Sequence, residues 1–545
     1  MTRPIRTACA LLLSLLATGS VVAAQSEEER SLTELRNTVI NLLQGLVDRG
    51  VITRDQAEQM VRDAKGKADV EAATLAAKDK AEETAVRVPY VPQIVKDEIR
   101  KQVTTDLTEQ VSKTVIEAAQ NEGWGVPAAM PDWVRRINWS GDVRVRLQDD
   151  LFASDNTPPG TPLSYLDFQR INDTGSIGAA GNTAYINTTE DRQRMRLRLR
   201  FGFDTVLGYG WKMGTRVTSG SLRDPVSTNQ TLGSYGFRYQ LGLDQAWLEW
   251  EGASHSGRQS LVTTFGRMRS PWFTPSELVF DQDLNFDGAA ATWRFGLNRR
   301  DPSLRTVYLT AGAFPLQEVE LSNKDKWLLA AQLGMNLKMT DTLRLNAGVG
   351  YFNFRNIAGT RNDFLSTLRD FTAPQYVRQG NSLFNIRNDS NATQLYALAS
   401  DFKLADAAFS LEWRLGEAHR LTLTGDAVRN VGFDSSRILA RTGFVIPERT
   451  DAYLAEVGFG SRVMAQTHAW RVAFGYRHVE RDAVLDAFTD SDFRLGGTDV
   501  KGYHFSLDYA LSPKVVSKLR FLSGSQIDGP PLGIDVVQLD LTASF

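Results

Sequence analysis

Hydrophobic and polar residues alternate along the chain in short segments from Trp139 to the last residue. In the first segment one apolar series faces one polar series: Trp139, Val143, Val145 and Leu147 against Asp142, Arg144, Arg146 and Gln148. The last segment repeats this with Val537, Leu539, Leu541 and Ala543 against Gln538, Asp540, Thr542 and Ser544. Successive side chains of a β-strand point to opposite faces, so the pattern predicts strands with one apolar and one polar face.

About sixteen such segments follow one another, and short turns alternate with long polar gaps such as 153–191 and 356–394. The stretch 395–415 fits either one bulged strand or a hairpin. A barrel of sixteen strands leaves a water-filled channel, whereas eight strands are plugged by their own side chains. The predicted segments begin near residues 139, 193, 209, 243, 259, 288, 304, 326, 341, 396, 419, 450, 468, 499, 515 and 534.

The apolar faces of these strands need either a protein core or lipid. Mean hydropathy is −0.28 and no long apolar run follows residue 24, which excludes a helical membrane protein. Mean hydropathy does not detect a transmembrane β-barrel, because half of the side chains in its strands are polar. We therefore expect residues 139–545 to form an all-β transmembrane antiparallel β-barrel. Parity alone does not say which face of each strand points inward.

The first 24 residues predict a signal peptide. Arg3 and Arg6 precede a short apolar stretch, and small residues end it at Ala24, so the mature chain would begin at Gln25. Cys9 is the only cysteine and lies in this segment. The mature chain would therefore contain neither disulfides nor thiolate metal sites.

Residues 25–122 predict a helical periplasmic segment. Hydrophobic residues recur there at spacings of three and four, and Thr53-Arg54-Asp55-Gln56 has the composition of a helix cap. Two interpretations are open for this region: a short coiled coil contributed by several barrels, or a flexible linker. Residues 123–138, which contain glycine and proline, would connect it to the barrel.

Five arginines share one face of the segment RQRMRLRLRF: Arg192, Arg194, Arg196, Arg198 and Arg200. An arginine facing lipid at the membrane midplane costs about 2–4 kcal/mol, so these side chains must meet water or acids. One interpretation is a pore-lining ladder that attracts anions. The other is a basic strand neutralised by acids of neighbouring strands, which serves only the cohesion of the wall.

The segment after the fifth predicted strand combines acidic with apolar residues and would form a constriction loop inside the pore. Its acids are Glu277, Asp281, Asp283 and Asp287. Acids opposite an arginine ladder create a transverse field that favours polar and zwitterionic solutes. A calcium loop is the alternative, but Phe286 and Thr292 stand where the helix-loop-helix motif requires glycine and glutamate.

No pattern of catalytic residues emerges. The five histidines lie outside any nucleophile elbow or zinc-protease motif, so we expect no enzyme, no catalytic residues, no cofactor and no metal. The formal net charge of −2 gives no basis for a nucleic-acid partner.

Several stretches resemble the putative porin family of Gram-negative outer membranes, which is related in plan to phosphate-selective porins. They are RVPYVPQIVKDEIR, NEGWGVPAAMPDWVRRINWSGDVRVR, FGRMRSPWF, FDQDLNFDGAA and LTGDAVRNVGFD. The resemblance implies a passive diffusion channel in the outer membrane, in contact with its lipid and often trimeric. Phe545 resembles the sorting signal read by the barrel assembly machinery.

We therefore expect a porin for small hydrophilic solutes, with a preference for anions. The alternative is a structural protein that tethers the outer membrane to the cell wall or to a periplasmic partner through its helical arm.

Overall fold

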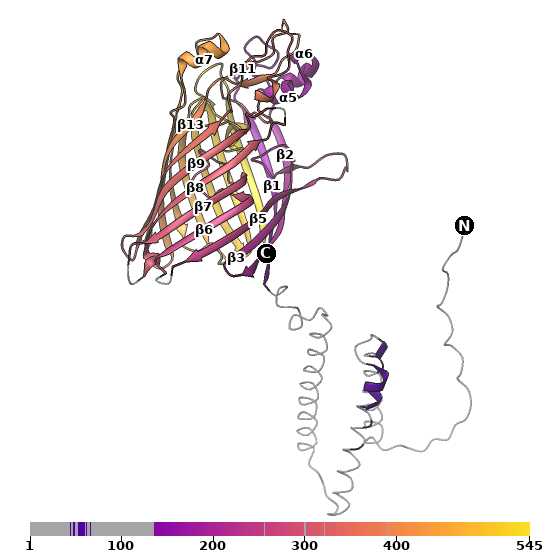
Figure 1. Ribbon diagram of the computed structural model, residues 1–545, viewed down its shortest axis with the longest axis vertical. Coiled ribbons are helices and arrows are strands. Elements are labelled where there is room, and N and C mark those ends of the chain that lie inside the picture. The colour runs from indigo at the N-terminus through magenta and orange to yellow at the C-terminus, as the bar shows by residue number, and fades with distance from the viewer. Residues whose placement is uncertain are drawn as a thin grey trace, which may run out of the picture. The chain divides into compact units, whose positions relative to one another are not determined.

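The computed structural model describes residues 136–545, apart from 255–256, 299–300, 321 and 391, and a few positions between 44 and 66. The chain divides into two units, 1–135 and 136–545. Within the described part of the second unit, sixteen strands form one barrel wall (Figure 1). These are β1 (Ile137–Phe152), β2 (Arg192–Gly208), β3 (Trp211–Ser219), β5 (Leu241–Ala253), β6 (Gln259–Arg269), β7 (Asn285–Gly296), β8 (Arg305–Gln317), β9 (Lys326–Lys338), β10 (Leu343–Arg355), β13 (Phe402–Leu415), β14 (His419–Asn430), β15 (Asp451–Ser461), β16 (Trp470–Val479), β17 (Val500–Ser512), β18 (Val515–Gln526) and β19 (Gly533–Ser544).

Every strand of the wall pairs antiparallel with its neighbours along the chain. The first strand also pairs with the last, since Val145 of β1 lies opposite both Leu541 of β19 and Leu197 of β2. The sheet therefore closes on itself and leaves no free edge in the wall. The predicted fold class of a closed barrel with sixteen strands is confirmed.

The predicted starts of the strands agree with the observed ones within three residues, with one exception. The start near residue 396 is wrong, because the barrel strand β13 begins at Phe402. Residues Tyr396–Leu398 form the short strand β12, which pairs with β11 (Leu383–Asn385) in a two-stranded sheet of its own. The stretch 395–415 is therefore neither a bulged strand nor a hairpin of the wall.

The two ends of the barrel differ. Short turns join strands at one end, which we call the short-turn end, and long segments join them at the other, the long-loop end (Figure 1). The long loops carry α5 (Phe168–Thr174), α6 (Ile177–Ala180), α7 (Ser435–Thr442) and the 3-10 turns η1 (Gly181–Ala184), η3 (Asp370–Thr372) and η4 (Phe493–Leu495). At the short-turn end lies η2 (Pro302–Leu304), and β4 (Gln230–Thr231) is a two-residue segment beside β2.

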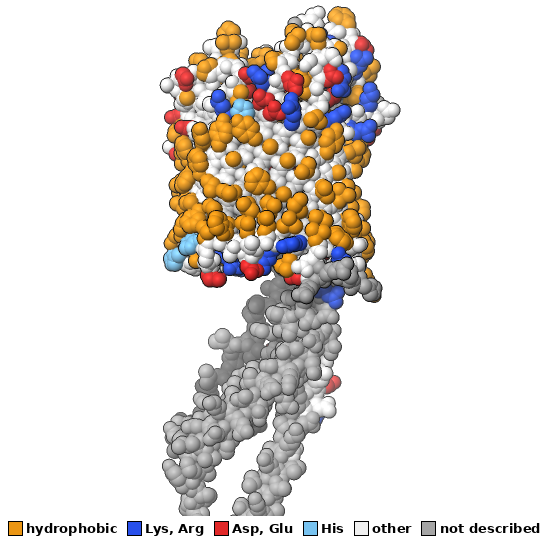
Figure 2. Space-filling model, turned by 90° about the vertical axis from the view of Figure 1, so that its left-hand side faces the viewer, with side chains coloured by type: hydrophobic (Ala, Val, Ile, Leu, Met, Phe, Trp, Pro, Cys, Tyr) orange, Lys and Arg blue, Asp and Glu red, His pale blue; other side chains and the backbone are white. Residues whose placement is uncertain are grey.

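The structure decides which strand face points inward. On β1 the apolar series is exposed (Trp139 55%, Leu147 48%), whereas Arg146 and Gln148 are each 2% exposed. The same holds on β19, where Leu541 is exposed and Asp540 is buried. Figure 2 shows the result as a belt of hydrophobic side chains between two charged rims. A wall with its apolar face outward and polar face inward is what a lipid environment requires.

The carboxyl end closes the seam between β1 and β19. The backbone of Phe545 pairs with that of Gly141, with N–H···O distances of 3.1 and 3.3 Å. A Cβ on Gly141 would lie 2.6 Å from the Phe545 ring and 2.6 Å from the Arg200 carbonyl oxygen, so only glycine leaves room for this ring. The ring also lies 6.2 Å from that of Phe201 on the outer face.

Only one feature of the amino-terminal unit can be compared with expectation. Thr53 Oγ1 accepts from the Gln56 N–H at 3.3 Å, and Gln56 Oε1 accepts from the Thr53 N–H at 2.9 Å. This reciprocal pair is a capping box, the arrangement that the sequence predicts at Thr53. The predicted signal peptide (1–24), most of the helical region (25–122) and most of the linker (123–138) lie outside the described residues.

Candidate functional site

The inner face of β1 and β2 is a basic wall. Asp142 accepts from Arg198 Nε at 2.9 Å and from Arg200 Nε at 2.7 Å, so one carboxylate serves two guanidiniums. Arg194 pairs with Asp150. Because β1 and β2 pair in register, these acids lie directly beside the arginines across the strands.

The remaining two arginines of the predicted ladder lie in different surroundings. Arg196 donates to Gln148 Oε1 at 3.3 Å and to Ser227 Oγ at 3.4 Å, both neutral partners. Arg192 is exposed at the long-loop end of β2. Four of the five predicted arginines therefore lie inside the barrel, and the fifth lies at its rim.

The 270–284 loop, which connects β6 and β7, folds into the lumen. Its apolar residues Trp272 and Phe280 pack against Phe352, with ring centroids 5.4 and 5.1 Å apart. Gln332 fixes the start of this loop by two bonds to the backbone of Phe273, at 2.7 and 3.0 Å. The loop folds inward because the inner face of β7–β10 is apolar and would otherwise meet water.

The tip of this loop reaches the basic wall. Asp283 lies 3.3 Å from Arg200 and 3.8 Å from Arg198, and it accepts from Thr228 Oγ1 at 2.8 Å. The 270–284 loop therefore bridges the lumen from β7–β10 to β2. It leaves its acid next to the arginines, as the sequence pattern predicts for a constriction.

Glu277 and Asp281 point elsewhere, towards the 480–499 loop between β16 and β17. Asp281 Oδ2 accepts from the Ser491 N–H at 3.0 Å, and the Glu277 carbonyl accepts from the Asp490 N–H at 3.2 Å. Burial, reinforced by the nearby Asp490 carboxylate, raises the pKa of Glu277 to about 7. Burial and then Glu277 raise the pKa of Asp281 as well.

Asp287 is not part of this cluster. It belongs to β7, where it pairs with Arg267 at 3.0 Å, and its side chain is 58% exposed. It shares the parity of Trp293, which is exposed on the outer wall. The structure thus separates Asp287 from the other three predicted acids.

The 480–499 loop is a second inward loop, and the sequence reasoning missed it. Asp490 pairs with Arg477 of β16 at 2.8 Å, and Asp492 pairs with Arg146 at 2.7 Å and Arg520 at 3.1 Å. The available signal was its composition: the stretch DAVLDAFTDSDFRL mixes acids with apolar residues as the 270–284 loop does. Buried residues of both loops belong to one hydrophobic cluster inside the barrel.

A polar chamber of about 410 Å³ lies beside the tip of the 270–284 loop. Val516 and Thr542 in its lining place it towards the short-turn end of β18 and β19. Its acids are Asp283 and Asp540, so positive charge is in excess. The cationic side chains in its lining are Arg144, Arg198, Arg200, Arg216, Arg269 and Lys518.

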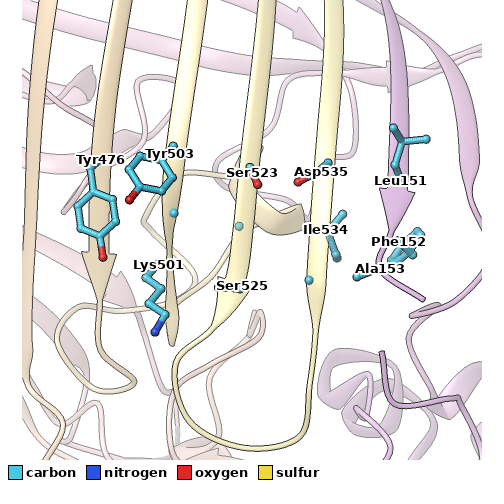
Figure 3. A pocket seen from close by; sticks show the side chains of 13 residues that line it. Leu151, Phe152, Ala153, Tyr476, Lys501, Tyr503, Ser523, Ser525, Ile534 and Asp535 are labelled. Atoms are coloured by element: carbon cyan, nitrogen blue, oxygen red, sulfur yellow. The ribbon is translucent and has the colours of Figure 1, made fainter. Parts of the chain in front are cut away.

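A second hollow, of about 530 Å³, lies on the outer face of the wall near the long-loop end (Figure 3). Tyr476, Tyr503 and Lys501 stand on one side of it and Leu151 on the other (Figure 3). Tyr503 is 53% exposed and shares its face of β17 with the outward Phe505, so this hollow is not part of the lumen.

The described residues contain no group of three or more histidine, cysteine or acidic side chains arranged to hold a metal. In the same residues, no helix has the length and apolar character needed to cross a membrane.

A closed barrel with an apolar outer belt and a charged lumen narrowed by inward loops defines a channel-type barrel of the outer membrane, the porin class. The chain belongs to the family described as "Putative porin", whose sequence model matches residues 36–545. Family and fold therefore point to a channel in the outer membrane of a Gram-negative bacterium and not to an enzyme.

The fold is also similar to solved outer-membrane structures. OprB of Pseudomonas putida shares 11% identity and a TM-score of 0.42, over 76% of this chain and 95% of that one. The outer membrane channel DcaP of Acinetobacter baumannii shares 12% identity and a TM-score of 0.32, over 75% and 97%. OmpT of Vibrio cholerae, as a loop-deletion mutant, shares 11% identity and a TM-score of 0.38, over 75% and 99%. No curated protein matches the chain.

Proposed function

We propose that this porin is a passive diffusion channel for small hydrophilic solutes that prefers anions. The observation that carries the proposal is the chamber beside Asp283, whose lining holds six cationic side chains and two acids. The cations remain in excess when the acids that pair with them from outside the lining, Asp142, Asp244 and Asp508, are included. A confined site with excess charge of one sign raises the local concentration of the opposite ion.

The path would run through the basic chamber, where the 270–284 loop meets the wall of β1–β3. Both interpretations of the ladder contribute to this picture. Asp142 and Asp150 hold Arg194, Arg198 and Arg200 in fixed positions, which serves cohesion. Asp142 and Asp283 both pair with Arg198 and Arg200, so the positive excess of the chamber comes from its other cationic side chains.

Conductance in planar bilayers tests this function. Purified, folded protein should give open-channel steps, and the reversal potential in a salt gradient should indicate anion preference. Absence of steps from folded protein would contradict the channel, and a cation-selective reversal potential would contradict only its preference.

We also infer that the barrel functions as a homotrimer, with the short-turn end and the amino-terminal region in the periplasm. The loop formed by residues 233–240, between β3 and β5, supports association. All of its residues are exposed, with Tyr235 at 97% and Phe237 at 74%. Aromatic side chains left in contact with solvent favour burial against a partner. Recognition of Phe545 by the assembly machinery belongs to the same proposal.

The structural alternative is a tether in which the helical arm contacts the cell wall or a periplasmic partner. Its support is the capped helix that begins after Thr53, and it is compatible with a conducting barrel.

A further inference from the structure

A cavity of about 530 Å³ lies among the loops at the long-loop end, and it shares no lining residue with the basic chamber. Its lining comes from residues 222–225, the facing ends of β8 and β9, Ile357, residues 374–377, Leu398 and residues 485–488. These segments are far apart in sequence, so the cavity exists only in the folded barrel.

Lys326, the first residue of β9, lies in this lining and is 2% exposed. Its ammonium donates to Gln317 Oε1 at 2.9 Å and to the Ala373 carbonyl at 2.6 Å, both neutral acceptors. Among the described residues no carboxylate lies within ion-pair distance of Nζ. An ammonium has three hydrogens, so it retains one for a ligand.

Asp486 lies in the same lining and is 1% exposed. Its Oδ2 atom has no hydrogen-bond partner. The neighbouring Arg378 pairs with Asp224, at 2.8 and 3.0 Å. Burial raises the pKa of Asp486 to about 7, although the Arg378 guanidinium and the backbone N–H groups of Arg378 and Ala487 partly offset it. A buried acceptor left unpaired costs about 1–3 kcal/mol, so a donor at this position is favourable.

The rest of the lining is mainly apolar. It includes Leu316, Ile357, Val377, Leu485 and Phe488. A mostly apolar cavity with a few convergent polar groups is the usual form of a small-molecule site.

We propose that this cavity binds a small zwitterion with an apolar substituent, such as an aliphatic α-amino acid. Its ammonium meets Asp486, its carboxylate meets Lys326, and its substituent fills the apolar lining. A monoanion would leave Asp486 unpaired, and a monocation would leave Lys326 unpaired. Only a ligand with both charges satisfies the two groups together.

This inference names a solute class for the proposed channel and places its binding at the long-loop end. Binding does not depend on conduction, so calorimetry can test it separately. If leucine fails to bind to a barrel that conducts anions, only the proposed binding site in the cavity at the long-loop end is wrong. If leucine binds to a barrel that does not conduct, only the channel is wrong.

Isothermal titration of the full-length folded protein with L-leucine is the test. We expect a Kd of about 1 mM or tighter, and at least about tenfold weaker binding of two analogues: 3-methylbutylamine, which lacks the carboxylate, and 4-methylpentanoate, which lacks the ammonium. Asp486→Asn should weaken leucine and the amine but not 4-methylpentanoate. Lys326→Met should weaken leucine and 4-methylpentanoate but not the amine.

Matched controls are Glu417→Gln and Lys338→Met, whose side chains lie at the short-turn end and outside this lining. Both should bind leucine as the parent does. If the buried variants do not fold, Gln375→Trp replaces an exposed lining residue and should block the cavity. Leucine binding unchanged in Gln375→Trp, or undetectable in the parent protein, would overturn the proposal.

Discussion

Arg146 of β1 and Asp492 of the 480–499 loop form an ion pair of 2.7 Å inside the barrel, with the arginine 2% exposed. Asp540 of β19 accepts from the same guanidinium at 2.7 and 2.9 Å. Burial alone would raise the pKa of Asp492, but Arg146 and Arg520 outweigh it and lower that pKa well below the usual range. This pair fixes the second inward loop to the seam of the barrel.

Asp492→Ala should therefore destabilise the folded barrel by about 3–5 kcal/mol, because Arg520 loses its ion-pair partner inside the barrel and Arg146 keeps only one of its two acids. The free energy of unfolding in urea, measured in detergent micelles, checks this value. Asp341→Ala is the control, since that carboxylate is 95% exposed and its loss should leave the free energy of unfolding almost unchanged. Equal effects of the two substitutions would contradict a structural role for Asp492.

Replacing Arg144, Arg198 and Arg216 together by glutamine should reduce the anion-to-cation permeability ratio by about twofold or more, because the chamber loses half of its positive charges. Reversal potentials in a salt gradient measure the ratio, and the effect should shrink at high ionic strength. Arg414→Gln, outside the chamber, is the control. An unchanged ratio would show that these guanidiniums do not govern permeation.

Glu277 should make stability depend on pH between about 4.5 and 7. In the unfolded chain this carboxyl ionises near 4.5, whereas in the barrel it keeps its proton up to about 7. The folded state therefore binds more protons in this window, so stability falls as pH rises through it and levels off above 7.

The Glu277→Gln variant should show a smaller slope of unfolding free energy against pH in that window. Some slope should remain, because burial also raises the pKa of Asp482 to about 6 and that of Asp486 to about 7. Glu417→Gln, at an exposed position, should keep the parent slope. A parent barrel whose stability does not change from pH 4.5 to 7 would show that Glu277 ionises normally.

Gly141→Val should slow closure of the barrel, because the added carbons would meet the Phe545 ring and the Arg200 carbonyl. The fraction of heat-modifiable, folded barrel in isolated outer membranes should fall severalfold. Gly178→Ala is the control, since its nearest neighbour would be 4.0 Å away. Normal assembly of Gly141→Val would mean that the position of the Phe545 ring is unimportant.

Deletion of residues 27–120 tests the amino-terminal arm. If the arm trimerises the barrels as a coiled coil, the shortened protein should migrate as a monomer on native gels. Migration at the parent oligomer size would show that the barrel, including its exposed 233–240 loop, is sufficient for association.

Much of the fold follows from local chemistry. Alternation places fifteen of sixteen strand starts within three residues, because lipid on one side and water on the other constrain every strand position. The exception near residue 396 arises because Tyr396–Leu398 is a strand by local pattern. Its partner β11 lies in the same long loop and not in the wall.

The site is less predictable. The arginine face of β2 and the inward 270–284 loop are visible in the sequence, but the acids that pair with them come from other strands. Asp142 and Asp540 look like ordinary inward polar positions until the register of β1 with β2 and β19 is known. Asp287 lies close to Asp283 in the sequence, but strand β7 starts between them and turns the Asp287 side chain to the outer face.

The two inward loops begin some two hundred residues apart, yet they are bonded to each other: the Asp281 N–H donates to the Phe488 carbonyl at 2.8 Å, and Thr489 Oγ1 donates to the Leu278 carbonyl at 2.8 Å. Replacing either loop alone with a foreign segment would therefore remove hydrogen bonds that hold the other loop in place. Retuning permeation by swapping segments in this barrel calls for exchanging both as a matched set.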